Sequence, residues 1–369
     1  MVTVKFLRFF ACFLLLYLLT AGTVLAQPQS PYEDYRSQLE LEYIIPVITY
    51  DGSFYVATYA KMSSVLRDQE LQFVFVGMER DLLNFCLGYT LHAPYWSYGL
   101  NLYHMPVYTG PLWSTGFWEL QQGVSLLASR HFTNEQRLDL RLQYEEFTPL
   151  SLAPYPVDSA SILGFEASVT RDNFNFFAQS GRRGYFSLGA AYPLLGTDYQ
   201  YLKAELDHRR YWPLGRFSLI LGMRAGKIWG DYPVHRGFAL GGIQQVSMSS
   251  LGSLANVGLL GTLADTVMRG YHEYRFCGDG FVLGNLELRL LAWPSSYREI
   301  RRTAFSLLAF ADAGMVWKGE NLLTASPSAG IGVGFKIFLY GLNLGLDYAV
   351  PLNTPGENPK WHFSIGEVF

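Results

Sequence analysis

The side chains that could carry enzyme chemistry in this 369-residue sequence follow no catalytic pattern. It contains no Gly-x-Ser-x-Gly elbow, no His-Glu-x-x-His, no phosphate-binding Gly-x-x-x-x-Gly-Lys and no Cys-x-x-Cys. Its seven histidines show no spacing typical of metal ligands. The sequence therefore predicts no enzyme, no cofactor and no metal site. A barrel lipase, which could assemble a Ser/His pair from separate strands, stays open as an alternative.

Ion pairing is the chemistry that the sequence favours, because its charged residues alternate with leucines. In Leu286 to Leu290, for example, Glu287 and Arg289 occupy every second position. A period of two predicts strands with one polar and one apolar face. Both a soluble sandwich with an apolar core and a membrane barrel with a polar lumen fit this pattern. The same alternation occurs in Arg137 to Tyr144, Leu202 to Arg209 and Leu342 to Tyr348.

The composition excludes two other classes of protein. Half of the residues (50%) are hydrophobic and 16% are charged, so there is enough apolar surface to offset the entropy of ordering the chain, which argues against intrinsic disorder. The formal net charge of −3 leaves no excess of cations to neutralise phosphates. We therefore expect no nucleic-acid partner.

The first residues predict export from the cytoplasm. Lys5 and Arg8 precede the apolar run Phe9–Leu19, and small residues follow as far as Ala26. This order is typical of a cleaved signal peptide over residues 1–26. A membrane anchor is the alternative, but eleven strongly apolar residues are fewer than the ~20 that a spanning helix needs.

The cysteines give a weaker indication. In an oxidising compartment Cys86 and Cys277 could form a disulfide. Two cysteines so far apart in the sequence are more often free packing residues, so both states stay open.

The membrane barrel is favoured over a soluble β protein by three features together. These are the export signal, the Trp and Tyr residues near the expected strand ends, and the last residues of the chain. The chain ends with apolar residues at alternate positions, Trp361, Phe363, Ile365 and then Phe369. This end resembles the terminal strand that outer-membrane barrels present to the barrel assembly machinery, although Glu367 departs from the pattern.

Alternation predicts about sixteen strands, an even number as a closed antiparallel barrel requires. The expected fold is all-β, a transmembrane antiparallel β-barrel over residues 38–369, preceded by a short extension over 27–37. The expected strands are 38–48, 53–62, 70–78, 82–91, 95–103, 115–127, 137–147, 161–170, 184–191, 199–209, 216–227, 281–292, 303–313, 327–337, 341–350 and 361–369.

One expected connection, about residues 229–280, is far longer than the others, and loops of this length are usually functional or disordered. It contains Met268-Arg269-Gly270-Tyr271, where Gly270 would allow a tight turn. With this motif the C-terminal half resembles the BamA and two-partner-secretion transporter superfamily, the bacterial surface antigen barrels. Barrels of that family fold a long loop into the lumen with a Val-Arg-Gly-Phe/Tyr motif at its tip.

Further short matches occur in the family's order over Thr170 to Phe369, just over half of the chain. Two departures are the methionine at 268, where the family has valine, and the 25 residues between Gly242 and Met268. The matching segments are Thr170 to Asn173 with Ser180-Gly181, Tyr201 to Leu214, Phe238 to Gly242, Leu286 to Arg289, Phe310 to Gly314 and Gly330 to Phe335.

The strand around Phe310 has Asp312 and Gly314 on the same face, and Glu287 lies on the charged face of the preceding expected strand. A guanidinium in a lumen loses part of its hydration and needs carboxylates within reach. The resemblance implies that Arg269 meets Asp312 and Glu287 inside the barrel, which would lock the loop in the lumen. The alternative is a mobile surface loop with Arg269 in solvent.

The resemblance also implies a function in the outer membrane of a Gram-negative-type cell, in which family members insert barrels or secrete a polypeptide. Only Gln27 to about Ser37 precede the first expected strand, so we expect a barrel-only member without polypeptide-transport-associated repeats. The expected partners are outer-membrane lipid, the assembly machinery, and a polypeptide client or a separate periplasmic protein. A gated or plugged solute channel, or a structural surface protein, is the alternative.

Overall fold

The computed structural model describes most of the chain after residue 38. The predicted signal peptide, the predicted extension, Phe369 and residues 243–266 of the long connection lie outside the described residues. Among the described residues, no helix is both long enough and apolar enough to span a membrane. The described ranges are 39–50, 54–77, 84–109, 117–150, 158–174, 180–194, 196–242, 267–272, 274–294, 303–319, 325–339, 342–354 and 356–365.

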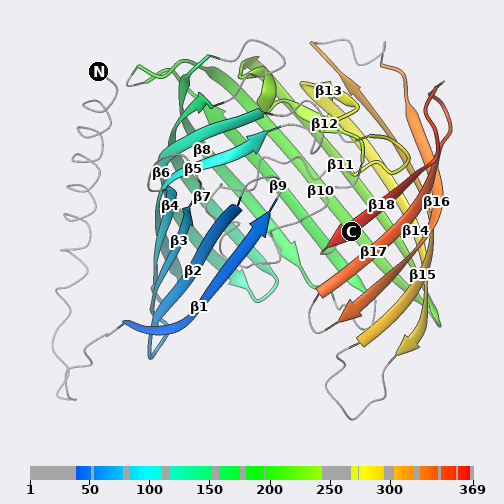
Figure 1. Ribbon diagram of the computed structural model, residues 1–369, viewed down its shortest axis with the longest axis horizontal. Coiled ribbons are helices and arrows are strands. Elements are labelled where there is room, and N and C mark those ends of the chain that lie inside the picture. The colour runs from blue at the N-terminus through cyan, green and yellow to red at the C-terminus, as the bar shows by residue number, and fades with distance from the viewer. Residues whose placement is uncertain are drawn as a thin grey trace. The chain divides into compact units, whose positions relative to one another are not determined.

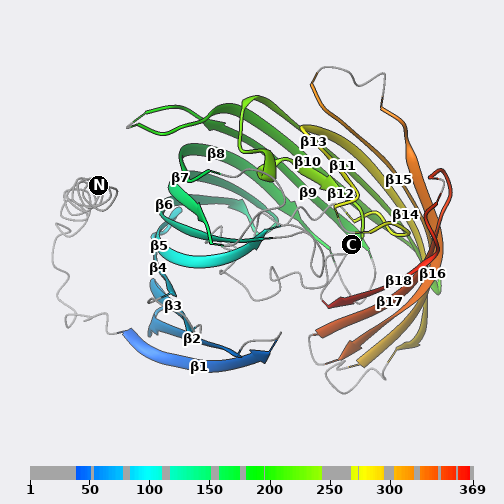
Figure 2. The same ribbon diagram turned by 45° about the horizontal axis from the view of Figure 1, so that its top comes forward.

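The dominant element is a single sheet of 16 strands, in the order β1 to β11 followed by β14 to β18. Each strand pairs antiparallel with the next strand in this order, so the connections are those of an up-and-down meander (Figure 1). This confirms the predicted all-β class and the predicted strand number. Figure 2 shows that the sheet curves strongly, so that it has a concave and a convex face.

The strands extend beyond the predicted runs at several ends. In the first half the bounds are β1 Leu39–Tyr50, β2 Phe54–Ser64, β3 Gln69–Gly77, β4 Asn84–His92, β5 Trp96–Thr109, β6 Phe117–Thr133, β7 Gln136–Pro149, β8 Ala160–Asp172 and β9 Gly181–Ala191. In the second half they are β10 Gln200–Leu214, β11 Phe217–Asp231, β14 Gly280–Pro294, β15 Thr303–Trp317, β16 Ser328–Leu339, β17 Leu342–Pro351 and β18 Lys360–Ile365.

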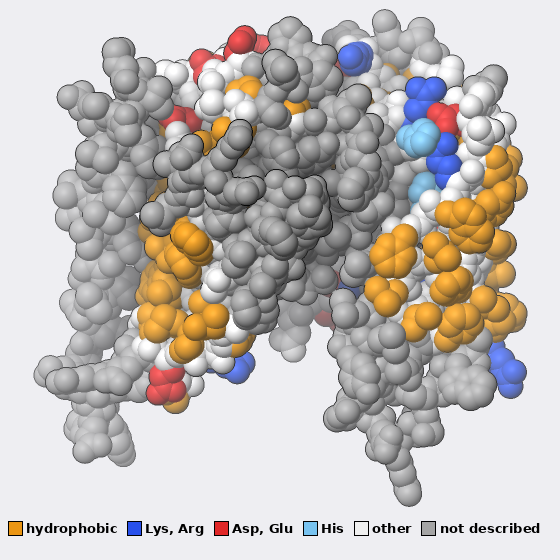
Figure 3. Space-filling view, in the orientation of Figure 1, with side chains coloured by type: hydrophobic (Ala, Val, Ile, Leu, Met, Phe, Trp, Pro, Cys, Tyr) orange, Lys and Arg blue, Asp and Glu red, His pale blue; other side chains and the backbone are white. Residues whose placement is uncertain are grey.

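The two faces of the sheet differ as the alternation predicts. On β14, Glu287 is fully buried, whereas Leu286 and Leu288 are 45% and 41% exposed. On β18, Trp361 and Phe363 are exposed on the same convex side. Figure 3 shows hydrophobic side chains gathered on the side of the molecule where β16 and β18 lie. Apolar side chains therefore face outward, which is the arrangement of a barrel in lipid and the reverse of a soluble sandwich.

The connection between β11 and β14 contains more structure than the sequence indicates. It starts with the 3-10 turn η1 (Val234–Arg236), and the short strand β12 (Phe238–Leu240) then pairs antiparallel with β13 (Phe276–Gly278). Beyond this pair, an isolated bridge joins Gly242 to Met268. The two ends of the long connection are therefore joined to each other, and Figure 2 shows them on the concave side of the sheet.

An apolar cluster holds this joined segment, here called the inner hairpin (residues 232–242 and 267–278), against the sheet. Packing of these side chains removes apolar surface from water and so stabilises the docked hairpin. The cluster comprises Ile228, Phe238, Leu240, Met268, Tyr271, Phe281 and Leu283.

Cys86 and Cys277, the cysteines within the described residues, are both free. Cys86 is buried on β4 beside Tyr103 and Met105, and Cys277 is exposed on β13. The structure therefore shows the unpaired state of the two that the sequence leaves open.

Candidate functional site

The motif Met268 to Tyr271 forms a turn at the end of the inner hairpin. Gly270 has a φ of 97°, in the region that favours glycine, because a side chain there is strained. Its amide N–H donates to Nε2 of His362 on β18 over 3.0 Å. A side chain at Gly330 on β16 would place its Cβ 2.2 Å from the carbonyl oxygen of Arg269. Both glycines allow the motif backbone to lie directly on the sheet.

Asp312 on β15 is the main partner of Arg269. The guanidinium donates from Nε to Oδ2 over 2.8 Å and from Nη2 to Oδ1 over 2.9 Å. The Arg269 backbone N–H also donates to Oδ2 over 3.0 Å. Asn285 on β14 donates to Oδ1 over 2.8 Å. The carboxylate therefore binds both the side chain and the backbone of the motif, in the two-pronged geometry that is strong for an Arg–carboxylate pair.

Two further carboxylates complete the surroundings of Arg269. Its Nη1 lies 3.1 Å from Oε2 of Glu287 on β14 and 3.3 Å from Oδ2 of Asp347 on β17. Glu287 also pairs closely with Arg289 on its own strand and lies 3.7 Å from Nζ of Lys336 on β16. The site thus contains three cations and three carboxylates within one buried network, and its formal charges balance.

Burial makes these contacts important for stability, because a buried charge without a partner is costly. Arg269 is fully buried, and its guanidinium carbon lies 3.4 Å from the ring centre of Phe310. Burial alone would lower the pKa of Arg269, but Asp312 first, then Glu287 and Asp347, outweigh it and raise the pKa above its ordinary value. The arginine is therefore charged in the folded protein and is compensated on several sides.

The other two residues of the motif are held by apolar packing and one hydrogen bond. Met268 and Tyr271 are both fully buried in the cluster under the inner hairpin. The Tyr271 hydroxyl donates to the carbonyl oxygen of Ala329 over 2.8 Å. The motif therefore contacts β14 through β18, a continuous part of the sheet.

The remaining predicted residues fall into two groups. Gly314 lies on the concave face of β15 beside Leu240 of the inner hairpin, so it belongs to the apolar contact rather than to the ionic one. Trp361 and Phe363 point to the convex face, in the outward alternation expected of a terminal strand, and Ile365 ends β18. Phe369 lies outside the described residues.

Sequence reasoning missed two neighbours of Arg269. Asp347 lies in a predicted alternating run, where it is one of the polar positions, so its orientation could have been inferred but not its proximity to the loop. His362 lies between the outward-facing Trp361 and Phe363. Its inward position follows from the same alternation.

A second ionic cluster at the start of the inner hairpin was also missed. Nη2 of Arg236 lies 2.9 Å from Oε1 of Glu119 on β6 and 2.6 Å from Oε1 of Glu145 on β7. Nε2 of His235 lies 3.1 Å from Oε2 of Glu119. Glu145 also accepts from the Tyr103 hydroxyl over 3.0 Å. Nothing in the sequence relates these residues, which come from four separate segments, β5, β6, β7 and η1.

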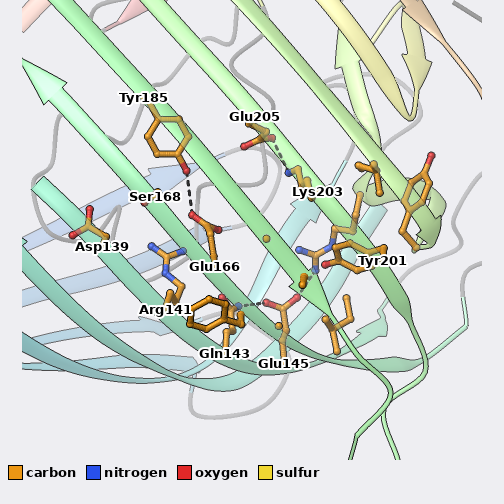
Figure 4. Close-up of a pocket in the computed structure, with 18 of the residues that line it drawn as sticks. Asp139, Arg141, Gln143, Glu145, Glu166, Ser168, Tyr185, Tyr201, Lys203 and Glu205 are labelled. Carbon is orange, nitrogen blue, oxygen red and sulfur yellow. Dashed lines mark hydrogen bonds and ion pairs between the residues drawn. The ribbon is translucent and has the colours of Figure 1, made fainter.

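A polar cavity of about 440 Å³ lies beside this second cluster. Most of its wall consists of residues of β7 to β10, shown in Figure 4, and Tyr232 and residues 236–238 of the inner hairpin also line it. The charges in it are largely paired: Nε of Arg137 lies 2.8 Å from Asp139, and Nζ of Lys203 lies 2.8 Å from Glu205. The interior on this side is therefore lined by charged and polar side chains rather than by an apolar core.

The sixteen-stranded antiparallel meander, with its apolar convex face and polar concave face, defines a transmembrane β-barrel. The chain belongs to the Omp85 superfamily, because the Omp85 superfamily domain matches residues 96–369. The members of this superfamily are outer-membrane β-barrel proteins, and they work with outer-membrane machinery and polypeptide clients.

Solved structures agree with this assignment at the level of the fold. BamA from Haemophilus ducreyi lacking POTRA domains 1–3 is similar with a TM-score of 0.63 and 14% identity, over 92% of this chain and 74% of that one. CdiB from Escherichia coli is similar with a TM-score of 0.53 and 12% identity, over 89% of this chain. The match spans 66% of CdiB, just under two thirds of its length. No curated protein shows significant sequence similarity to the chain.

Proposed function

We propose that this protein is an outer-membrane barrel that assembles or translocates polypeptides, with its inner hairpin locked in the lumen by Arg269. Superfamily membership supports the polypeptide function, and the fold of BamA and CdiB supports the architecture. Delivery to the outer membrane would follow cleavage of the signal peptide after Ala26. We propose that this function needs no enzymatic chemistry, because the buried charges around Arg269 and Arg236 bind one another.

The observation that carries the proposed lock is the burial of Arg269 among carboxylates of three different strands. Asp312, Glu287 and Asp347 come from β15, β14 and β17, so one side chain ties the hairpin tip to a wide part of the wall. Pulling the tip away would leave these carboxylates buried without their main cation, which costs several kcal/mol. The lock therefore keeps the hairpin docked during thermal fluctuations of the barrel.

The proposed partners follow from the two faces of the sheet. Outer-membrane lipid would cover the convex leucines, and the assembly machinery would recognise the outward alternation of Trp361 and Phe363 on β18. A polypeptide client, with or without a separate periplasmic protein, would use the interior or the strand edges. The charged concave face supports an aqueous route for polar backbone groups.

A plugged or gated solute channel is the second candidate, and the polar cavity is the observation that favours it. The two functions differ in what they need. A solute channel conducts steadily in a planar bilayer without a client, whereas an assembly barrel promotes insertion or passage of a polypeptide. Measuring conductance and the insertion rate of a model barrel into vesicles containing the protein separates them. Steady conductance with no change in insertion rate would contradict the polypeptide function.

The lock itself is tested by charge reversal. We expect Arg269→Asp and Asp312→Arg each to destabilise the barrel in a heat-modifiable gel mobility assay, and the double variant to recover part of the loss. Arg137→Asp is a matched control on the concave face of β7, since Arg137 pairs with Asp139 on its own strand. No recovery in the double variant would count against the lock.

A further inference from the structure

The first residues of the inner hairpin cross to a different part of the sheet from the motif at its tip. Glu119 and Glu145, on β6 and β7, hold Arg236, whereas Arg269 binds β14, β15 and β17. Strands β8 to β11 lie between these two regions in the order of the sheet. The inner hairpin is therefore attached to the sheet at two separated places.

The contacts on β6 and β7 are buried and well formed. Glu119 is fully buried, and the side chains of His235 and Arg236 are 3% and 14% exposed. The His235 ring packs edge-on against Phe117 and Phe147, with ring centres 5.7 Å and 5.1 Å away. Ion pairs on a protein surface are not enclosed by aromatic rings in this way, so these residues form a specific, buried contact.

Electrostatics favour a charged Arg236 at this place. Burial alone would lower the pKa of Arg236, but Glu145 and Glu119 outweigh it and raise the pKa above its ordinary value. The guanidinium carbon also lies 5.4 Å from the ring centre of Phe147. Removing this cation would leave two carboxylates close together in a poorly hydrated place, and their repulsion would push the hairpin start away.

The attachment of Arg236 to β6 and β7 also places the hairpin against one side of the polar cavity. Arg236, Gly237 and Phe238 form the hairpin side of the polar cavity whose other wall is β7 to β10. Phe238 is 3% exposed, and Nζ of Lys203 lies over its ring, 5.0 Å from the ring centre, in a cation–π contact. If the hairpin start left β6 and β7, this side of the cavity would open towards the rest of the concave space.

We propose that His235 and Arg236, held by Glu119 and Glu145, form a second anchor that closes the interior along β7 to β10, independently of the Arg269 lock. Releasing this anchor opens the cavity to water and ions while the hairpin tip stays docked. The effect on conductance rests on the proposed placement of the barrel in a membrane. The effect on side-chain accessibility does not.

Thiol labelling tests the anchor in the folded, detergent-solubilised protein. Ser168 on β8 lines the cavity and is 6% exposed, so Ser168→Cys in a Cys277→Ser background reports access. The native Cys86, which is 1% exposed, serves as the internal standard for unfolding. The reagent is a water-soluble maleimide. We expect Arg236→Met to raise the labelling rate of the Ser168→Cys reporter about tenfold, with no change at Cys86. A tenfold change corresponds to a loss of about 1.4 kcal/mol in the free energy that keeps the cavity closed.

Arg216→Met is the matched control, because it removes an exposed arginine from the turn between β10 and β11, which does not line the cavity. Equal labelling rates in Arg236→Met and Arg216→Met would overturn the proposal. A parallel rise at Cys86 would also overturn it, because the variant would then be opening globally. The charge swap Arg236→Glu with Glu145→Arg should return labelling towards the parent rate.

Planar bilayers then test the consequence for ions. We expect Arg236→Met to raise the mean conductance about twofold, because the closed side of the interior becomes an aqueous path, while Arg216→Met leaves it near the parent value. Increased labelling with unchanged conductance would overturn the ion path and keep the anchor. Failure of every variant, the parent included, to insert into bilayers would instead contradict the membrane placement in the proposed function.

Discussion

Two arginines hold the inner hairpin, and their surroundings differ in how completely they compensate a buried charge. Arg269 is fully buried, with Asp312 bound to both its side chain and its backbone N–H. Arg236 retains 14% exposure of its side chain and binds carboxylates through one nitrogen, Nη2. The first site includes Arg289 and Lys336 as further cations. In the second site, His235 and Arg236 bind the same carboxylate, Glu119.

This difference indicates which anchor is permanent and which can be released. A buried network with balanced charges is costly to disturb, because every member loses a partner that water cannot replace at once. A partly exposed arginine can exchange its carboxylates for water more readily. We infer that the Arg269 site is the structural attachment of the hairpin, and that the Arg236 site is the one whose release changes the interior.

The largest effect is expected from Arg269→Met, which removes the cation and keeps most of the side-chain volume. Asp312, Glu287 and Asp347 would remain buried, so the free energy of unfolding should fall by about 3–5 kcal/mol. The measurement is urea-induced unfolding of the protein folded in phosphocholine vesicles, followed by tryptophan fluorescence. Arg269→Lys should lose much of this stability as well, since an ammonium cannot bind Asp312 with two parallel hydrogen bonds.

The matched control for this substitution is Arg216→Met, which removes an arginine from the turn between β10 and β11. Its free energy of unfolding should stay close to that of the parent. If Arg269→Met were no less stable than this control, the proposed division between a permanent and a releasable anchor would be wrong.

An intermediate effect is expected from Arg236→Met. Several donors to the two carboxylates remain, since Gln121 binds Glu119 and both Tyr103 and Gln143 bind Glu145. The free energy of unfolding should therefore fall by about 2–3 kcal/mol, less than for Arg269. The same urea titration checks it. A loss as large as that of Arg269→Met would remove the contrast between the two anchors.

The contrast between the anchors also explains how much the sequence could predict. Alternation predicts that Glu287 and Asp312 point to one side of their strands, and the family motif indicates Arg269 as their partner. Strict periodicity is a strong signal because a strand has only two faces. The sixteen strands were predictable for the same reason.

The second anchor could not be predicted in this way. Arg236 lies 117 residues from Glu119 and 91 from Glu145, and it belongs to a 3-10 turn without periodicity. Alternation shows which way a glutamate points, but it does not show which loop folds back to meet it. The contact depends on the curvature of the sheet and on the path of the hairpin, neither of which is encoded in a local pattern.

A smaller effect is expected from Tyr271→Phe, which tests whether the hairpin tip depends on charge alone. The substitution keeps the ring in the apolar cluster and removes the hydroxyl that donates to Ala329. Because the Ala329 carbonyl would lose this donor, the free energy of unfolding should fall by about 1 kcal/mol. Thermal unfolding by heat-modifiable mobility measures it against the parent. A loss comparable with that of Arg269→Met would mean that the tip is held mainly by Tyr271.

The smallest effect is expected at an exposed counterpart of the two anchors. Arg275 of the inner hairpin lies 2.8 Å from Glu357, in the connection between β17 and β18, and is 45% exposed. Glu357 also pairs with Lys360 over 3.0 Å. Because the arginine is in contact with water, Glu357→Gln should change the free energy of unfolding by less than about 1 kcal/mol.

The pKa of Glu357 predicts how the stability difference between the parent and Glu357→Gln changes with pH. Burial alone would raise the pKa of Glu357, but Lys360 and then Arg275 outweigh it, so the folded pKa lies below the ordinary value. The contribution of Glu357 is therefore present above about pH 4.3, the usual glutamate value, and disappears as the pH falls through the lowered pKa. Unfolding curves of the parent and Glu357→Gln should differ slightly at pH 7 and converge under acid. A difference that grows as the pH falls would show that the fold stabilises the protonated form of Glu357. The pair with Arg275 would then not be an exposed ion pair, and the comparison with the two buried anchors would fail.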